Sequence, residues 1–396
     1  MHIAFVTPES PYGDAAACGV AAYLRALIPA ICDAGHQVTV FAKANEKRDF
    51  LAEDGRVCLH HFRLPSLHWY SSKIPVVRRL APLPWRQLEW SREFYRRVAR
   101  VAAHDKIDVI ESTETGSLYL ARIAPLVIRL HGSELTFRKH SGTPLDWSVK
   151  WNDALEARAC RRAYAVTSPS RSQAEEIIAR RRWPADSIKI IPNPISARLF
   201  KAAGEFHRNG NRERIVLYTG RLAPVKGIET LLTAARLVHE KDPSVRFVLA
   251  GPWQMPQAPE AYGLRLSEIS ANGIQWVGPQ NRSDLIEWYK RAELFVMPSH
   301  FESFGISVVE ALAFGLPVVA TDVSGLKEAV GTNPATSFVS KGNAREMSEA
   351  IIAAISGIKT EPAEAHRSIQ NFSAVRVAEQ TIKLYESVLR NSTNAN

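Results

Sequence analysis

The chain has 396 residues, of which 46% are hydrophobic, and it carries 50 Lys and Arg against 40 Asp and Glu. This length predicts two or three compact domains, and the composition excludes wholesale disorder. No apolar run approaches the roughly 20 residues that span a bilayer, and the N-terminus begins directly with a strand-like run. We therefore expect no membrane-spanning helix, no secretory signal and a cytoplasmic location. The four cysteines are far apart and lack CxxC spacing, which predicts neither disulfides nor a zinc site.

The positive charge is concentrated in the first half of the chain. Residues 1–200 hold 29 Lys and Arg against 20 Asp and Glu, whereas residues 201–396 hold 21 against 20. The basic residues cluster in Lys73–Arg100, at Arg158, Arg161 and Arg162, and in Arg180–Arg182. Such an asymmetry suits an anionic membrane, an acidic substrate or nucleic acid, and it is also compatible with a plain solvated surface.

Short apolar, β-branched runs alternate with longer helical patterns, which is typical of βαβ units and parallel sheets. In the first half we predict strands at His2–Thr7, Gln37–Ala42, Val57–Phe62, Asp108–Glu111, Val127–Leu130, Ala165–Thr167 and Lys189–Ile191. Helices are predicted at Val20–Cys32, Arg86–Ala103, Trp147–Ala163 and Ser172–Arg181.

The same alternation starts again in the second half. Strands are predicted at Ile215–Thr219, Arg246–Ala250, Ile274–Val277, Leu294–Met297, Val318–Ala320 and Ser337–Val339, and helices at Ile228–Glu240, Leu264–Ala271, Ser283–Arg291, Ile306–Phe314 and Ala344–Ile355. The predicted fold is α/β, with two Rossmann-like domains, 1–195 and 214–365, that face each other across a cleft. Residues 196–213 are polar and basic and are predicted as a linker, and a last helix at about 373–390 is long enough to cross back to the first domain.

Ligands of open α/β sheets bind beyond the carboxyl ends of the strands, so the loops there are the candidate sites. After the first strand, a glycine-containing loop opens a helix at Gly19, which lets backbone N–H groups approach an anion. The loop is not GxGxxG, so a structural turn is the alternative. After the strand at Ile215–Thr219, the sequence Gly220-Arg221 through Lys226-Gly227 places two cations beside a helix, which suits a diphosphate. Two ordinary surface cations are the alternative.

The most specific segment is Pro298–Ala311, where a strand leads through a loop into a helix that starts near Gly305. The free N–H groups of Phe304, Gly305 and Ile306 are suited to a phosphate or sugar hydroxyls. Glu310 lies about 7 Å further along the helix, where it would reach a ribose diol, and Glu302 precedes the helix on the side of the transferred group. The alternative is a loop acid and a solvated helix residue, although the apolar surroundings of Glu310 disfavour a surface position.

These motifs resemble the GT-B retaining glycosyltransferases of family 4. The resemblance rests on the Glu302-x7-Glu310 spacing, on Pro298-Ser299 through Gly305, on Gly315-Leu316-Pro317, and on the Gly220-Arg221 and Lys226-Gly227 pairs. It also covers His131-Gly132-Ser133 and Ile191-Pro192-Asn193-Pro194 in the first half. Where many relatives have a Gly-Gly pair in the first loop, this chain has Cys18-Gly19.

The resemblance implies that a sugar moves from a nucleotide-sugar, a UDP- or GDP-sugar being expected, to an acceptor hydroxyl with retention of the anomeric configuration. It assigns the acceptor to the first domain and the donor to the second, and it implies neither a metal nor a separate cofactor. The implied catalytic residues are Glu302, His131, Arg221 and Lys226. The implied donor-binding residues are Gly19, Arg221, Lys226, Gly278, Ser303, Phe304, Gly305, Ile306 and Glu310, with base recognition around Trp253 and Gly278–Arg282.

Three alternative functions remain at this stage, one of them a catalytically silent GT-B partner subunit, against which the presence of Arg221, Lys226, Glu302 and Glu310 argues. A sugar phosphorylase or a sugar-phosphate synthase would share the same fold and donor site. A nucleic-acid-binding protein is suggested only by the positive charge, and no reader motif supports it. The basic stretch Lys73–Arg100 interleaves cations with Trp85, Trp90, Phe94 and Tyr95, and follows Trp69 and Tyr70. It suggests peripheral contact with an anionic membrane or a lipid-linked acceptor, or else an ordinary amphipathic helix packed on the first domain.

Overall fold

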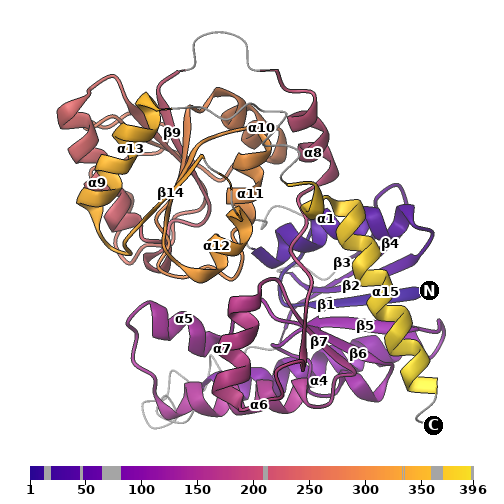
Figure 1. Cartoon of the computed structure of the whole chain (residues 1–396). Coiled ribbons are helices and arrows are strands. Elements are labelled where there is room, and N and C mark those ends of the chain that lie inside the picture. The colour runs from indigo at the N-terminus through magenta and orange to yellow at the C-terminus, as the bar shows by residue number, and fades with distance from the viewer. Residues whose placement is uncertain are drawn as a thin grey trace. The chain divides into compact units, whose positions relative to one another are not determined.

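The computed structural model describes residues 1–12, 19–44, 48–64, 82–207, 213–331, 333, 335–357 and 369–393. The chain divides into two compact units, each built on its own sheet (Figure 1). The first unit is Met1–Pro192 together with Ala374–Asn396, and the second is Asn193–Ser373. The second unit is therefore a continuous segment inserted between two parts of the first.

The sheet of the first unit has eight strands in the order β3-β4-β2-β1-β5-β6-β7-β8. Neighbouring strands are parallel except for β3, which pairs with β4 in the antiparallel sense. The bounds are β1 (His2–Thr7), β2 (Gln37–Lys43), β3 (Arg48–Ala52), β4 (Val57–Phe62), β5 (Val109–Thr113), β6 (Leu126–Arg129), β7 (Ala165–Ser168) and β8 (Ile188–Ile190). The order reverses between β1 and β5, which makes this pair the switch point of the sheet.

Helices cover both faces of this sheet, because its central strands are apolar on both sides. One core contains residues of α1 (Gly19–Asp33) and α15 (Ala374–Thr393). The core on the other face contains residues of α4 (Pro82–Ala102), α6 (Trp147–Cys160) and α7 (Arg171–Arg181). The short α5 (Glu134–His140) follows β6 and packs against α6.

The C-terminal helix α15 is joined to the first unit by polar as well as apolar contacts. Tyr385 donates a hydrogen bond to one Glu111 oxygen at 2.8 Å, and Tyr23 of α1 donates to the other at 2.9 Å. All three side chains are buried, and burial raises the pKa of Glu111. The crossing helix expected at about 373–390 thus corresponds to α15, which packs beside α1.

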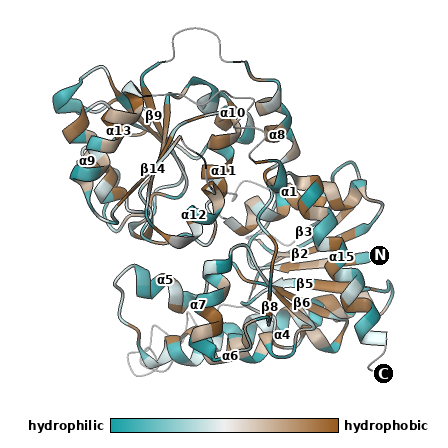
Figure 2. Ribbon diagram, in the orientation of Figure 1, coloured by the Kyte–Doolittle hydropathy of each residue, from teal (hydrophilic) through white to brown (hydrophobic). Residues whose placement is uncertain are grey.

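The sheet of the second unit has six parallel strands in the order β11-β10-β9-β12-β13-β14. Their bounds are β9 (Ile215–Thr219), β10 (Arg246–Ala250), β11 (Ile274–Gly278), β12 (Leu294–Met297), β13 (Val318–Thr321) and β14 (Thr336–Val339). The helices are α8 (Ala197–Gly204), α9 (Ile228–Lys241), α10 (Arg282–Arg291), α11 (Ile306–Ala313), α12 (Ser324–Val330) and α13 (Ala344–Ser356). The strands are hydrophobic and lie inside the unit (Figure 2). The predicted pair of parallel α/β domains is confirmed.

Two predictions about local structure are wrong. Residues 264–271 are not helical: Ser267 and Ser270 donate backbone bonds to Trp276 and Ile274, so the segment pairs with the open edge of β11. The segment 196–213 is not only a linker, because it begins with α8, whose Leu199 and Ala203 are buried in the second core. Residues 208–212 of that segment lie outside the described part. None of the described helices combines the length and hydrophobicity that a bilayer crossing requires.

Candidate functional site

Two loops meet at the switch point of the second sheet, where the strand order reverses between β9 and β12. Lys226 lies after β9 and Glu302 after β12, and the Lys226 Nζ lies 2.6 Å from the Glu302 Oε1. Ser299 donates to the same carboxylate oxygen at 2.9 Å. Both charged side chains are mostly buried, at 16% and 10% exposure. The structure therefore brings together two predicted site residues that are 76 positions apart in the chain.

Backbone contacts hold these two loops at a fixed separation. The His300 N–H donates to the Val225 carbonyl at 2.9 Å. Gly227 has a φ of +66°, and a Cβ added there would lie 2.0 Å from the Pro298 carbonyl oxygen. Only glycine fits this position, because both the backbone conformation and the space exclude a side chain.

Arg221 contributes a second cation to the same strand end. Its carbonyl accepts a hydrogen bond from the buried Tyr218 hydroxyl at 2.8 Å, which fixes the backbone directly after β9. In the part of the chain that the structure describes, no carboxylate lies within ion-pair distance of its guanidinium, in contrast to Lys226. Arg221 is thus available to a ligand anion.

The helix α11 begins at Ile306, close to where the sequence places it. Gly305 caps it with a φ of +94°, and a Cβ there would lie 2.5 Å from Leu326 Cδ2. Phe304 is buried, with its ring 5.4 Å from that of Phe372, whereas Ser303 is half-buried. The first N–H groups of a helix have no partner within it, so the turn at 304–306 offers donors next to Glu302.

Glu310 lies on α11 but is not a free carboxylate. It is buried and forms an ion pair with Arg282, and Tyr289 donates to its second oxygen at 2.9 Å. Since the Tyr289 proton is used in this way, the hydroxyl of Thr219, at the end of β9, donates to Tyr289 at 2.8 Å. The neighbouring carboxylate raises the pKa of Arg282. A ribose at Glu310 would therefore meet a carboxylate already held by two groups of α10.

Aromatic side chains come from the segment after β10 and from β11 itself. Trp253 lies 5.5 Å from Trp276 and 5.4 Å from Tyr262, between ring centroids. The Trp276 indole donates to the Gly251 carbonyl at 2.9 Å. Gly278 ends β11 with a φ of +71°. The three rings form an aromatic patch, inclined at 63° and 56° to one another, at the same sheet edge as the two cations.

In the first unit, Gly19 is the first residue of α1 and is exposed. A Cβ added to Gly19 would meet nothing within 4 Å, so the fold itself does not require glycine there. The preceding Cys18 lies outside the described residues, as do Trp69, Tyr70, Lys73, Arg78 and Arg79 of the basic stretch.

His131 lies in the turn between β6 and α5. Glu114, just beyond β5, accepts the His131 N–H at 3.3 Å and the Gly132 N–H at 3.2 Å. Burial, with a smaller contribution from Arg129, lowers the pKa of His131 to about 3, so the imidazole is neutral at ordinary pH. Its ring lies 5.2 Å from that of Tyr23. The structure thus holds His131 as a neutral donor or acceptor in a fixed turn.

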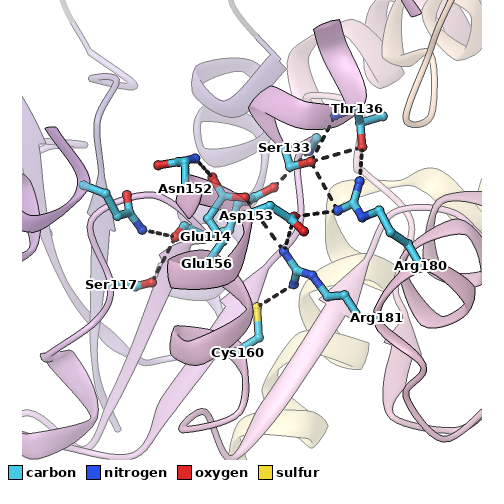
Figure 3. Close-up of polar contacts among 12 residues, drawn as sticks. Glu114, Ser117, Ser133, Thr136, Asn152, Asp153, Glu156, Cys160, Arg180 and Arg181 are labelled. Carbon is cyan, nitrogen blue, oxygen red and sulfur yellow. Dashed lines mark hydrogen bonds and ion pairs between the residues drawn. The ribbon is translucent and has the colours of Figure 1, made fainter. Parts of the chain in front are cut away.

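A mostly buried polar cluster contacts the residues that follow this turn, Ser133 and Thr136, through Arg180 (Figure 3). Arg180 and Arg181 both donate to Asp153, at 2.9 and 3.0 Å, and Arg180 also reaches Thr136 at 3.1 Å. Asn152 donates to Glu156 at 2.8 Å. Burial, followed by the charge of Glu114, raises the pKa of Glu156 to about 8.

The sequence patterns found the residues that face the strand ends but missed the groups that hold them. Arg282 was expected near the base and not on Glu310, and Tyr289, Ser299 and Glu114 were assigned no role. The position of Glu114 directly after a buried strand is the signal that identifies it. Among the described residues, no group of three or more His, Cys, Asp or Glu side chains is arranged to hold a metal ion.

Comparison with known proteins gives a consistent result along the chain. Residues 17–199 match the model for Glycosyltransferase Family 4, and residues 202–371 match that for Glycosyl transferases group 1. D-inositol 3-phosphate glycosyltransferase of Pseudarthrobacter chlorophenolicus is 28% identical over 82% of this chain and 79% of its own. Glycogen synthase of Mycobacterium tuberculosis is 27% identical over 83% of this chain and 80% of its own.

Solved structures share the fold over the full length. Sucrose-phosphate synthase from Thermosynechococcus elongatus superposes with a TM-score of 0.75 at 21% identity, covering 98% of this chain and 99% of that one. Anabaena HepE, solved in complex with UDP, has a TM-score of 0.68 at 21% identity and covers 98% and 100%.

Proposed function

Since this chain belongs to the GT-B glycosyltransferases, with a family 4 first half and a group 1 second half, we propose that it uses a nucleotide-sugar donor and retains the anomeric configuration. The transfer of a glycosyl group is the established class of reaction. The donor, the acceptor and the roles of individual residues are the content of the proposal. Polysaccharide, glycolipid or glycoside biosynthesis is the process that it would serve.

The observation that carries the proposal is the Lys226–Glu302 pair beside the N-terminus of α11. A diphosphate bound there would take Lys226 and Arg221 as counter-ions, and the N–H groups of 304–306 would donate to it. Glu302, released from Lys226, would accept hydrogen bonds from sugar hydroxyls. The two cations would stabilise the charge that develops on the departing nucleoside diphosphate.

The remaining donor contacts follow from the same sheet edge. Glu310 would hold the ribose while Arg282 and Tyr289 keep the carboxylate oriented. The base would lie at the aromatic patch near Gly278, and Ser303 would line the sugar. A UDP- or GDP-sugar is the donor that we expect, with neither a metal nor a separate cofactor, because Arg221, Lys226 and the helix N-terminus supply the positive charge.

For the first unit, we assign His131 to the donor sugar and Gly19 to close approach by a phosphate or the acceptor. A sugar, a small molecule or a lipid-linked sugar is the acceptor class, and nucleic acid is not a partner. The proposal also includes a cytoplasmic location with peripheral contact to an anionic membrane.

The test is a thermal-shift series with UDP, GDP, ADP, dTDP and NAD, on the wild type and on Arg221→Ala and Glu310→Gln. One nucleoside diphosphate should stabilise the wild type, and its effect should fall at least about tenfold in apparent affinity in Arg221→Ala. Stabilisation by NAD instead, or by an oligonucleotide, contradicts the donor assignment.

Two further readouts separate the alternatives of the same fold. Proton NMR of the product made from the identified nucleotide-sugar should show the donor's anomeric configuration. Preferential transfer to inorganic phosphate or to a sugar phosphate would favour a phosphorylase or a sugar-phosphate synthase over a transferase that uses a plain hydroxyl.

A further inference from the structure

The outer face of α6 is made of aromatic and basic side chains. Trp147, Lys150, Trp151 and Arg158 are exposed and recur at helical spacing, and Arg161 and Arg162 extend the face just beyond the helix. Trp147 and Trp151 are 50% and 41% exposed and stack on each other, with 5.9 Å between ring centroids. The two rings contact each other, but about half of each side chain is still exposed to solvent.

The neighbouring helix α4 repeats this arrangement. Its Phe94 and Val98 are buried against the sheet, so the expectation of an amphipathic helix packed on the first unit holds for that face. Its opposite face exposes Trp85, Arg92, Arg96 and Arg100 at helical spacing. The exposed tryptophans of the described chain all belong to α4 or α6.

The acidic residues of these two helices do not neutralise the face. Glu93 pairs with Arg97, and Asp153 with Arg180 and Arg181, while Glu156 is buried. The acidic side chains of α4 and α6 are all buried or half-buried. Among the described residues, no ion pair engages the outward arginines of the two helices (Arg92, Arg96, Arg100, Arg158, Arg161 and Arg162).

Both helices run the same way, so their aromatic ends lie together. Each helix connects two parallel strands, α4 from β4 to β5 and α6 from β6 to β7, so each starts near the carboxyl ends of the strands and runs back toward their amino ends. Near the start of α4, Gln87 accordingly donates to the Glu114 carbonyl just beyond β5. The two helices pack against each other. The tryptophans therefore lie toward the carboxyl edge of the sheet, the edge that carries the His131 turn, and the arginines extend toward the amino edge.

We propose that this outward face of α4 and α6 is a docking surface for an anionic lipid bilayer. The three tryptophans occupy the headgroup region, where indole rings are favoured, and the arginines contact lipid phosphates. A single bilayer surface can contact Trp85 of α4 and the Trp147–Trp151 pair of α6 at the same time. A bilayer in this position lies beside the carboxyl edge of the first sheet. If the proposed function holds, that is where a lipid-linked acceptor would arrive.

The charge pattern favours a bilayer over other occupants. A protein or nucleic-acid partner would account for the arginines, but three outward tryptophans gathered at one end of a cationic surface match the layered structure of a membrane interface. The cations belong to the half of the chain that carries nearly all of the excess positive charge.

The test is flotation of the full-length protein with vesicles of phosphatidylcholine alone or with about 30% phosphatidylglycerol. We compare Arg92→Gln/Arg96→Gln/Arg158→Gln with Lys189→Gln/Arg236→Gln/Lys383→Gln, a control that removes the same charge from exposed positions elsewhere. A second pair is Trp147→Gln/Trp151→Gln against Leu51→Gln/Val375→Gln, which removes exposed apolar side chains of the same unit.

The wild type should float with the anionic vesicles only, and binding should disappear at about 1 M salt, where the Debye length is about 3 Å. The arginine variant should lose about a hundredfold in partition coefficient and the tryptophan variant about tenfold, whereas both controls should stay within about threefold of the wild type.

Three outcomes overturn the proposal. The wild type fails to float with anionic vesicles at low salt, or the charge control loses as much as the arginine variant. In the third, an oligonucleotide or a second copy of the chain, detected by light scattering, binds through these residues while the vesicles do not. The nucleoside diphosphate thermal shift is measured on the same variants. A wild type that floats with anionic vesicles but is stabilised by no nucleoside diphosphate would count against the proposed donor site and not against this surface.

Discussion

The charge of Glu310 is balanced by Arg282 of α10, and removing this partner should lower the stability of the second unit measurably. Replacing Arg282 with Met should destabilise the second unit by about 2 kcal/mol, because a buried carboxylate then loses its counter-ion. This loss is smaller than for a fully buried ion pair because Arg282 is 18% exposed, so water partly screens the pair. Differential scanning calorimetry should show the transition lowered by about 4–8 °C.

Two more variants show whether the loss comes from the unpaired charge. Glu310→Gln should cost less than Arg282→Met, because Arg282 can reach water. The double variant should recover part of the loss. If Arg282→Met melts like the wild type, the ion pair contributes nothing to stability.

Glu156 predicts a pH dependence of the first unit. Its folded pKa of about 8 lies above the ordinary value of 4.5, so the native state binds a proton that the unfolded state releases between these values. Stability from this group is therefore present below about pH 4.5 and is lost as the pH rises toward 8. Glu156→Gln, which mimics the protonated acid, should lie close to the wild type at pH 5 and exceed it by up to about 4 kcal/mol at pH 9.

Chemical denaturation of both proteins at several pH values measures this difference. Asp186→Asn removes an exposed carboxylate of the same unit and serves as the control. A constant offset between Glu156→Gln and wild type across the pH range would show that Glu156 is ionised in the native state.

At the level of single residues, spacing identified the side chains at the strand ends but not their partners. Lys226 and Glu302 could be predicted because each lies in the segment that follows a strand, within a recognisable motif. Their contact could not, since it depends on two loops far apart in the chain. The same holds for Arg282 and Glu310, which come from different helices and meet only after the sheet has formed.

At the level of elements, the contact between the β9 and β12 loops leaves no room for a side chain. Gly227→Ala should separate them, because the new Cβ would overlap the Pro298 carbonyl oxygen. We expect a loss of more than about 2 kcal/mol and loss of nucleoside diphosphate binding. Gly342→Ala, with a φ of +78° and open space around it, carries the conformational strain alone and should cost about 1 kcal/mol. Equal effects of the two variants would rule out the steric explanation.

The elements themselves were predictable to different degrees. Buried parallel strands are continuous apolar runs, so all of the predicted strands are present. The edge strand β3 was missed because only one of its sides pairs and its residues are mostly exposed. The helix predicted at 264–271 is absent: its apolar residues Leu264, Leu266 and Ile269 are two and three positions apart and do not form a helical stripe. The unpaired edge of β11 determines the conformation of this segment instead, and this information is not local.

At the level of the whole molecule, the two units differ in how their chain is assembled. The second is continuous, whereas the first needs Ala374–Asn396 to complete one face of its sheet. The core on that face contains the buried Val377, Tyr385 and Val388, and Tyr385 donates a hydrogen bond to one of the two Glu111 carboxylate oxygens. Stability of the first unit therefore depends on residues that follow the second unit in the sequence.

This dependence predicts different consequences of cutting the chain. Residues 193–373 expressed alone should fold and, if the donor site is there, should be stabilised by the same nucleoside diphosphate as the full chain. Residues 1–192 alone should not fold, because α15 is missing and apolar surface on β1, β2 and α1 stays exposed. Within the full chain, Tyr385→Phe should destabilise the first unit by about 1–3 kcal/mol, since one Glu111 oxygen loses its hydrogen-bond donor. Only the melting transition that the nucleotide does not shift should then move to a lower temperature. Val375→Gln changes an exposed residue of the same helix and should leave both transitions in place. A single transition that moves as a whole in Tyr385→Phe would mean that the two units unfold as one cooperative body.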